Sequence, residues 1–190
     1  MENLGETKSN NDKLKSQLEA YGVDTTVWGT GGYKTIDHLV KEIEDQEVIL
    51  DFNEDGELTR ISEVVAAMIL CIHDDKMYRL KEEKQVFIDG RERVRPSAGQ
   101  SVFEKMKLGE KPDEAILRGI AEELSIAGEI ILNYIEKVEN IADSKSYPGL
   151  ITKSTTHFFE VELTAEQFKS QGYIEEQADK ITFFVWEQIG

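Results

Sequence analysis

The chain lacks three features that would assign it to a broad class of protein: paired cysteines, a long apolar run and an excess of basic residues. Its only cysteine, Cys71, lies in the apolar stretch EVVAAMILCIHDD. It cannot form an internal disulfide, and we expect it to pack as a small hydrophobic residue. No apolar run reaches the length of a membrane span, and the N-terminal residues are polar and of mixed charge. We therefore expect a cytoplasmic protein that has no membrane partner.

The scarcity of basic residues leaves a strongly acidic chain. Its 22 lysine and arginine residues face 38 acidic residues, which gives a formal net charge of -16. Such a charge repels phosphate backbones at long range and argues against a bulk nucleic-acid partner. A small phosphorylated ligand would need a metal ion or a local basic patch. The stretch WGTGG does not supply a phosphate-binding loop, because it lacks that loop's glycine spacing and its Lys-Ser/Thr pair.

The 190 residues are enough for one well-buried core with an extension. We predict three segments: a tail with a short helix over residues 1–22, a helix and hairpin over 23–60 that pack on the core, and the main domain over 61–190. In the second segment, apolar residues at helical spacing predict an amphipathic helix, and Asp55-Gly56 predicts the hairpin turn.

The main domain alternates strand-like and helix-like stretches. A continuously apolar run over 64–72 predicts a central strand. Further strands are predicted at 85–89, 92–96, 129–141, 152–163 and 181–189, with a short helix over 164–173. These elements predict an α/β (α+β) fold in which helices flank a mixed β-sheet, with a small N-terminal helical extension.

Residues 109–126, GEKPDEAILRGIAEELSI, predict one amphipathic helix with an unusual residue in its middle. Pro112 suits the first helical turn, and the acidic residues around it favour the positive end of the helix dipole. Ile116, Ile120 and Leu124 line one face, so we expect the charged faces to lie in solvent. Gly119 interrupts the helix at a cost of about 1 kcal/mol relative to alanine.

Adjacent carboxylates on this helix are candidate metal ligands. Glu122 and Glu123, with Glu110 ahead of the helix, offer the oxygen atoms that Mg²⁺ prefers in sites that also bind phosphates. The alternative is a solvated acidic face, which is common on surface helices.

The spacing over residues 104–126, EKMKLGEKPDEAILRGIAEELSI, resembles the Nudix box. The family pattern is Gly, five residues, Glu, seven residues, then Arg-Glu-aliphatic-x-Glu-Glu-x-Gly-aliphatic. The residues on matching positions are Glu110, Arg118, Ile120, Glu122, Glu123 and Ile126. Three positions depart from the pattern: Glu104 replaces the first Gly, Gly119 replaces the Glu after Arg, and Ser125 replaces the last Gly.

The resemblance implies a Nudix-like α/β/α sandwich and a hydrolase that uses Mg²⁺ or Mn²⁺. Its substrate class would be a nucleoside diphosphate linked to another group, which makes it a pyrophosphatase. Other stretches, such as WGTGGYKTIDHLVKEI and SYPGLITK, resemble an uncharacterised Nudix-like group of fungi, algae and plants, which extends the resemblance from about residue 23 to the C-terminus. Glu122 and Glu123 would be metal ligands, with Glu104 or Glu110 assisting and Arg118 orienting Glu122.

Gly119 removes a carboxylate that the family commonly uses as a metal ligand or as a base. The resemblance makes Glu104 the best replacement, because the family uses a backbone carbonyl beside the metal at this position. A side chain from there could reach the space that Gly119 leaves, and we include Glu104 among the metal ligands. The alternative is an exposed Glu104 paired with Lys105 or Lys107. Two hypotheses therefore stay open: a metal-dependent hydrolase, and a weakened or inactive Nudix-like domain that binds a ligand or regulates.

Four residues are candidate contacts to a small, nucleotide-like phosphorylated ligand. The resemblance places Lys105 near the phosphates. Arg93 and Arg95 alternate with Arg91 on one strand face and can bind phosphate, although pairing with surface acids is the alternative. We expect Tyr147 to be exposed in a lid-like loop, where it can stack on a base, with an ordinary turn as the alternative. A homodimer stays open.

Overall fold

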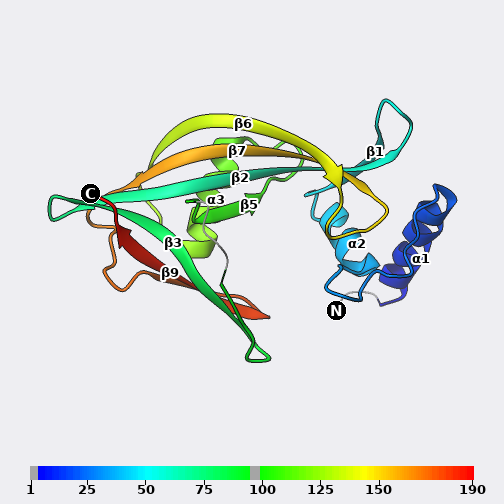
Figure 1. Ribbon diagram of the computed structural model, residues 1–190, viewed down its shortest axis with the longest axis horizontal. Coiled ribbons are helices and arrows are strands. Elements are labelled where there is room, and N and C mark those ends of the chain that lie inside the picture. Colours follow the sequence, from blue (N-terminus) through cyan, green and yellow to red (C-terminus); the bar gives the residue numbers. More distant parts are fainter. Residues whose placement is uncertain (1–3, 95–98) are drawn as a thin grey trace. The chain divides into compact units, whose positions relative to one another are not determined.

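The computed structural model describes residues 4–94 and 99–190 (Figure 1). Three helices are described: α1 (Leu4–Ala20), α2 (Ile36–Glu44) and α3 (Pro112–Leu124). The strands are β1 (Ile49–Phe52), β2 (Leu58–His73), β3 (Lys76–Phe87), β4 (Glu92–Arg93), β5 (Val102–Lys105), β6 (Ile131–Asp143), β7 (Ile151–Leu163), β8 (Tyr173–Glu176) and β9 (Lys180–Gln188). In this described part of the chain, no helix is long and apolar enough to cross a membrane.

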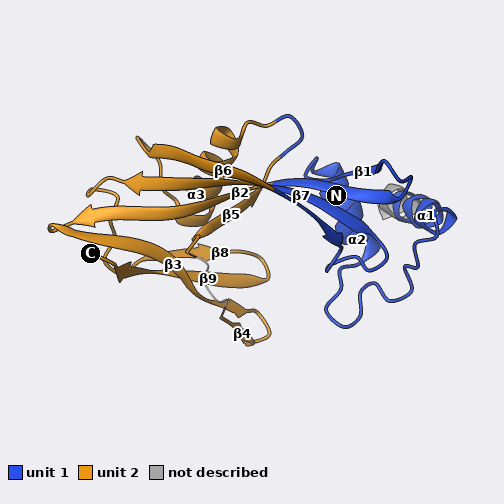
Figure 2. Ribbon diagram, turned by 45° about the horizontal axis from the view of Figure 1, so that its top comes forward, with its two compact units in different colours: residues 1–63, 107–109, 139–155 blue, residues 64–106, 110–138, 156–190 orange. Residues whose placement is uncertain are grey.

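The chain divides into two compact units (Figure 2). Unit 1 contains the residues up to Glu63 together with Lys107–Gly109 and Glu139–Thr155. Unit 2 contains Val64–Met106, Glu110–Val138 and Thr156–Gly190. Unit 1 thus takes residues 139–155 from the stretch that the sequence assigned to the main domain. Whether residues 23–60 need the rest of the chain in order to fold remains a prediction.

One nine-stranded sheet contains all the strands, in the order β6-β7-β2-β3-β9-β8, with β1 and β5 also paired to β2 and β4 to β3. Strands β2 and β7 are neighbours, and both run from unit 1 residues to unit 2 residues, so they are parallel. The pairs β2–β3, β2–β5, β3–β9 and β8–β9 are antiparallel. The sheet is therefore mixed, and the prediction of an α/β (α+β) fold with N-terminal helices is confirmed.

Unit 1 has its own apolar core. Thr35 caps α2: its hydroxyl accepts a hydrogen bond from the backbone N–H of His38, whose ring in turn accepts from the backbone N–H of Thr35. The apolar face of α2 then packs into a cluster with residues from α1 and from the segment before β7. Its buried members are Leu18, Val23, Trp28, Leu39, Val48, Tyr147 and Leu150. The predicted helix and the hairpin between β1 and β2 are both confirmed.

Unit 2 is built around α3. The apolar face predicted for this helix, with Ile116, Ile120 and Leu124, is buried against the sheet. Cys71 is only 1% exposed and packs in the same core, as predicted. Burial in this apolar environment raises the pKa of its thiol.

The helix predicted over 164–173 is wrong. Residues 165–167 form a turn instead, and strand β8 begins at Tyr173. The side chain of Gln167 accepts a hydrogen bond from the backbone N–H of Thr164 and donates to the carbonyl oxygens of Ala127 and Glu129. Trp186 Nε1 also donates to the carbonyl oxygen of Lys169. The contacts with Ala127, Glu129 and Trp186 join this segment to residues far away in the sequence. They stabilise the turn in place of a helix, and the local helical pattern does not contain them.

Candidate functional site

A pocket of about 250 Å³ opens on unit 2, and its lining is dominated by carboxylates. Five glutamates from four elements line it: Glu82 on β3, Glu104 on β5, Glu122 and Glu123 on α3, and Glu175 on β8. The other lining residues are Gln85, Phe103, Gln177, Lys180 and Thr182. Lys180 is thus the one basic side chain against five acidic ones in this lining.

The helix that carries Glu122 and Glu123 has the termini that its sequence predicts. Pro112 occupies its first turn, with Asp113 and Glu114 beside it. It ends at Ser125, which has left-handed φ and ψ angles of 53° and 39°. Glycine takes this conformation most easily. Ser125 stands where the Nudix box has glycine, so the left-handed turn is present without that residue.

Gly119 is buried where α3 crosses β5. A Cβ atom added at Gly119 would lie 2.8 Å from Glu104 Cβ and 3.3 Å from Val102 Cγ1. The first distance is too short for two carbon atoms, so the side chain of Glu104 occupies the space that a side chain at position 119 would need. The expectation that this charged helix face lies in solvent is wrong for Gly119, which is buried, and for Glu123, which is half-buried.

Arg118 links several acidic groups beside this contact. Its guanidinium donates two hydrogen bonds to Glu110, each 3.0 Å long, and a 2.8 Å bond to Glu104 Oε1. It also donates to the carbonyl oxygen of Lys105 at 2.8 Å, and Glu122 Oε2 lies 3.6 Å from it. The hydrogen bonds to Glu110 are the main reason why the pKa of Arg118 is raised. Arg118 therefore fixes Glu104 and Glu110, whereas Glu122 is exposed and only loosely paired.

Glu123 has the most perturbed carboxyl group of the pocket. Burial, followed by the negative charges of Glu175 and Glu104, raises the pKa of Glu123 to about 9. A backbone hydrogen bond with Phe103 acts in the opposite direction but does not compensate. Like charge from neighbouring carboxylates therefore adds to the effect of burial on Glu123. Perturbed groups of this kind concentrate at functional sites.

The donor set of the pocket is chemically suited to a hard divalent cation. Carboxylate oxygens are the ligands that Mg²⁺ and Mn²⁺ prefer. In residues 4–94 and 99–190, however, no group of three or more His, Cys, Asp or Glu side chains is arranged closely enough to hold a metal ion. Glu122, Glu123 and Glu104 all line the pocket, so the predicted ligands are brought to one place without forming a closed site.

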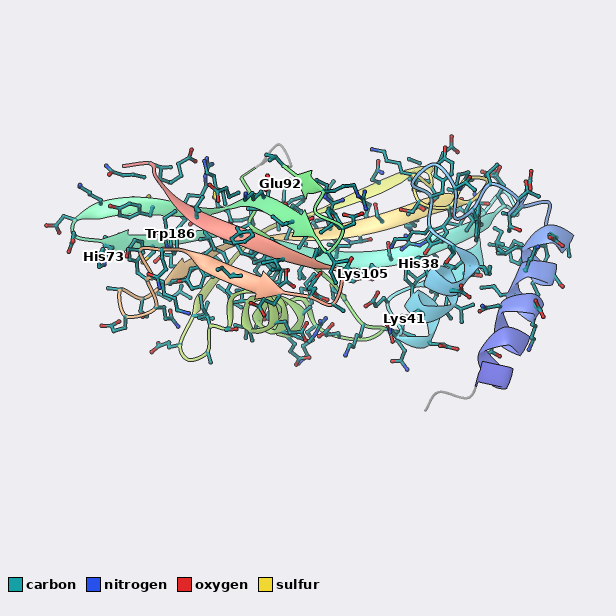
Figure 3. The ribbon with its side chains drawn as sticks, turned by 90° about the horizontal axis from the view of Figure 1, so that it is seen from below. His38, Lys41, His73, Glu92, Lys105 and Trp186 are labelled. Atoms are coloured by element: carbon teal, nitrogen blue, oxygen red, sulfur yellow. The ribbon has the colours of Figure 1, made fainter. Side chains whose placement is uncertain are left out.

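The basic residues predicted to contact substrate lie at different distances from this pocket. Arg93 on β4 donates hydrogen bonds from Nε (3.0 Å) and Nη2 to Gln85 Oε1, and Gln85 lines the pocket. Arg91 instead forms an ion pair with Asp89 at 2.6 Å, as the alternative interpretation expected. Lys105 on β5 (Figure 3) is half-buried and does not line the pocket. The prediction for Arg95 lies outside the described residues.

The prediction that Tyr147 is exposed is wrong. Its side chain is fully buried in the core of unit 1, with its ring centroid 5.1 Å from that of Trp28. Trp28 Nε1 also donates a hydrogen bond to the carbonyl oxygen of Pro148, so Trp28 contacts the loop at both Tyr147 and Pro148. Tyr147 fixes the loop in unit 1 because its ring is an apolar anchor, so it is not available to stack on a ligand.

Two of the pocket's glutamates, Glu82 and Glu175, were not predicted from the sequence. Both lie on strands that the sequence did not predict at those positions. Strand β3 starts at Lys76, nine residues before the predicted strand, and β8 follows the wrongly predicted helix. The short alternation Tyr78-Arg79-Leu80-Lys81 was the available signal for the start of β3, and the polar run that follows it hides the rest of the strand.

No protein-family model and no curated protein matches the sequence. Among solved structures, the NUDIX domain of Shewanella oneidensis NrtR in complex with ADP ribose is 14% identical, with a TM-score of 0.37, over 66% of this chain and 71% of that chain. The C. elegans Ap4A hydrolase is 13% identical, with a TM-score of 0.38, over 66% and 79% of the two chains. The E. coli dihydroneopterin triphosphate pyrophosphohydrolase is 20% identical, with a TM-score of 0.39, over the same shares.

The first of these structures is a NUDIX domain by its title. Independently of the structures, residues 104–126 of this chain resemble the Nudix box in sequence. At this level of similarity, the chemistry of the chain has to be argued from its own residues.

Proposed function

We propose that the carboxylate pocket of unit 2 is the active site of a Nudix-type hydrolase. It would use Mg²⁺ or Mn²⁺ to cleave a phosphoanhydride bond in a nucleoside diphosphate linked to another group. The observation that carries the proposal is the contact between Gly119 and Glu104. Compared with the Nudix box, glycine and glutamate have exchanged places across this contact. The exchange keeps a carboxylate in the pocket, because Glu104 lines it.

The charge of the pocket supports dependence on a divalent cation. A phosphorylated substrate would meet the carboxylates of Glu82, Glu104, Glu122 and Glu175 and one lysine, so its own negative charge would be repelled. Glu122 and Glu123 would hold the cation, with Glu104 as a third ligand. When bound, the cation would neutralise phosphate charge and lower the pKa of a water molecule.

The chain's own residues have separate parts in this proposal. Glu123 must lose the proton that its raised pKa favours, so cation binding and proton release are coupled. Arg118 holds Glu104 and Glu110 in position through its hydrogen bonds. Glu104 would accept the proton of the attacking water. Arg93, linked to the pocket through Gln85, is the candidate contact to the outer phosphate.

The second candidate is a Nudix-like domain that binds a ligand without cleaving it. One observation favours it: the carboxylates of Glu104 and Glu110 are both held by hydrogen bonds from Arg118, which occupy the oxygen atoms that a general base would use. Under this hypothesis, the cation and ligand still bind, but no phosphate is released.

A phosphate-release screen over nucleoside diphosphate derivatives, with Mg²⁺ and with Mn²⁺, distinguishes the two candidates. The hydrolase should show activity that Glu104→Gln and Glu123→Gln each reduce by about 100-fold or more. Glu114→Gln, on the same helix but outside the pocket, is the matched control and should keep full activity. Absence of activity on every substrate, with calorimetry still detecting Mn²⁺ binding that Glu123→Gln abolishes, would support the binding domain instead.

A further inference from the structure

A second polar pocket, of about 290 Å³, lies entirely in unit 1. It is formed by β2, β6, β7 and the loop between β6 and β7, which contains the sequence SKSYPG. Its lining includes Arg60, Asp143, Ser144, Lys145, Ser146 and Thr152. An adjoining hollow of about 490 Å³ shares Asp143, Ser144 and Lys145 with this pocket and adds Tyr33. None of these residues lines the carboxylate pocket of unit 2.

The loop that forms one wall of this unit 1 pocket is held in place by hydrogen bonds. The backbone N–H of Ser144 donates to the carbonyl oxygen of Leu150 at 2.8 Å, and the backbone N–H of Tyr147 donates to Ser144 Oγ at 3.1 Å. The buried ring of Tyr147 fixes the middle of the loop in the core of unit 1. The wall is therefore preformed, and a ligand would not have to order the loop when it binds.

The pocket contains hydroxyl groups that the fold leaves able to donate. Thr152 Oγ1 is buried and has no hydrogen-bond partner within the described part of the chain. Leaving a buried hydroxyl without a partner costs about 1–3 kcal/mol, and a bound ligand can remove that cost. Ser144 is 8% exposed, and its Oγ accepts one hydrogen bond, from the backbone of Tyr147, so its O–H can still donate.

The charge of this pocket contrasts with that of the carboxylate pocket. Its lining holds two cations, Arg60 and Lys145, and one carboxylate, Asp143. Arg60 pairs with Glu42, but Lys34 binds the same carboxylate at 2.5 Å, so two cations share one anion behind the pocket. Arg60 Nη1 makes a contact of 3.4 Å with Ser62 Oγ, which leaves it able to donate to a ligand. The pocket therefore has a local excess of positive charge in a strongly acidic chain.

This set of donors is suited to a phosphate group. Guanidinium and ammonium groups form charge-assisted hydrogen bonds with phosphate oxygens, and hydroxyl groups add neutral ones. Asp143 also lines the adjoining hollow, where its carboxylate can accept hydrogen bonds from hydroxyl groups of a ligand. Tyr33 is 41% exposed and offers an aromatic face in the same hollow. A phosphate joined to a hydroxylated, partly aromatic group would therefore match both parts.

We propose that unit 1 binds a small organic phosphate, with the phosphate group at Arg60, Lys145 and Thr152 and the organic part beside Tyr33. The chain itself supplies the positive charge, so this site needs no metal ion. It is separate from the proposed active site in unit 2, where a phosphate would be repelled unless a divalent cation were bound.

Calorimetry on the full chain in the presence of EDTA tests the proposal, with AMP as the probe. AMP should bind, and adenosine, which lacks the phosphate, should bind at least about tenfold more weakly. Lys145→Gln and Thr152→Val should each weaken AMP binding about tenfold. Lys153→Gln is the matched control, because Lys153 is next to Thr152 but lies outside the pocket, 4.0 Å from Glu139. Absence of AMP binding, equal binding of adenosine, or equal losses in all three variants would overturn the proposal.

Two further variants identify the site and the source of the phosphate. Glu123→Gln should leave AMP binding in EDTA unchanged, and a loss there would place AMP in the carboxylate pocket and refute the unit 1 site. AMP should bind more tightly than inorganic phosphate, and Tyr33→Ala should reduce that difference. If inorganic phosphate binds as tightly as AMP, the occupant is free phosphate and the assignment of an organic part is wrong.

Thr152→Val also gives a readout that does not depend on any ligand. Valine has a shape close to that of threonine and lacks the hydroxyl that has no partner within the described residues. The variant should therefore be at least as stable as the wild type in urea denaturation without ligand. A loss of stability would mean that the hydroxyl is already paired in the folded chain, which would remove Thr152 from the site.

Discussion

Two carboxylates, one in each unit, differ in the charges that surround them. Glu42 in unit 1 is only 5% exposed, and Lys34 Nζ and Arg60 Nη2 lie 2.5 Å and 2.9 Å from its oxygens. Glu123 in unit 2 is half-buried, and its charged neighbours include Glu175 and Glu104. The first carboxylate is balanced by cations, and the second is surrounded by like charge. A buried carboxylate that is paired with cations is compatible with a stable fold, whereas one placed beside other carboxylates destabilises it. The environment of Glu123 therefore indicates a ligand-binding site.

The balanced carboxylate should be the more costly to remove. Glu42→Gln leaves the guanidinium of Arg60, whose side chain is 11% exposed, without its carboxylate. We expect the free energy of unfolding to fall by about 3 kcal/mol, as for other broken buried ion pairs. Urea denaturation measures this. Asp45→Asn, which breaks the exposed pair with Lys41, is the control and should cost at most about 0.5 kcal/mol. Equal costs for the two variants would remove the contrast between the units.

The contact that brings Glu104 into the pocket can be tested by exchanging its two residues. Gly119→Ala should destabilise the protein by about 2 kcal/mol despite the better helix propensity of alanine, because the new Cβ meets Glu104 Cβ at 2.8 Å. In a Glu104→Gly background the same change should cost much less, since the nearest remaining side-chain atom, Val102 Cγ1, is 3.3 Å away. The double-mutant cycle measures this coupling. Additive effects would mean that the two residues do not compete for space.

Gly119 also shows what the sequence was able to predict. Periodicity gave α3 and its buried face, because the apolar spacing of Ile116, Ile120 and Leu124 is local. The spacing of the Nudix box also pointed to Glu104 as the partner of Gly119. That Glu104 and Gly119 are in contact depends on how β5 crosses α3, which no local pattern contains.

The errors have the same origin. Tyr147 stands in a stretch with proline and glycine, which favours an exposed loop, but its ring is buried through contacts with Trp28, more than a hundred residues earlier. Glu82 reaches the pocket from β3, whose pairing with β9 is non-local. Glu175 reaches it from β8, which pairs with the neighbouring strand β9 in place of the predicted helix. Composition and periodicity therefore found the helix and its carboxylates, while the rest of the pocket required the sheet.

The unbalanced carboxylate should reveal itself in the pH dependence of stability. The pKa of Glu123 is about 9 in the folded chain, and its ordinary value is 4.5. Between these values the folded state holds a proton that the unfolded state has lost, so this group makes the protein less stable as the pH rises from 4.5 to 9. Glu123→Gln should remove that decline, and saturating Mn²⁺ should reduce it in the wild type. Thermal melts at several pH values measure both effects, and identical slopes for wild type and variant would contradict the raised pKa.

The smallest effect is expected at the end of the helix that carries Glu123. Ser125 has a φ angle of 53°, a left-handed conformation that costs a residue with a Cβ about 1–2 kcal/mol. Glycine avoids this cost, but it also increases the conformational entropy of the unfolded chain, which offsets part of the gain in stability. Ser125→Gly should therefore raise the free energy of unfolding by about 0.5 kcal/mol. Ser125→Val is the contrasting variant, because a β-branched residue is disfavoured at positive φ and should lower stability. If Ser125→Gly and Ser125→Val change stability in the same direction, the helix does not end in the left-handed turn that positions Glu122 and Glu123 ahead of it.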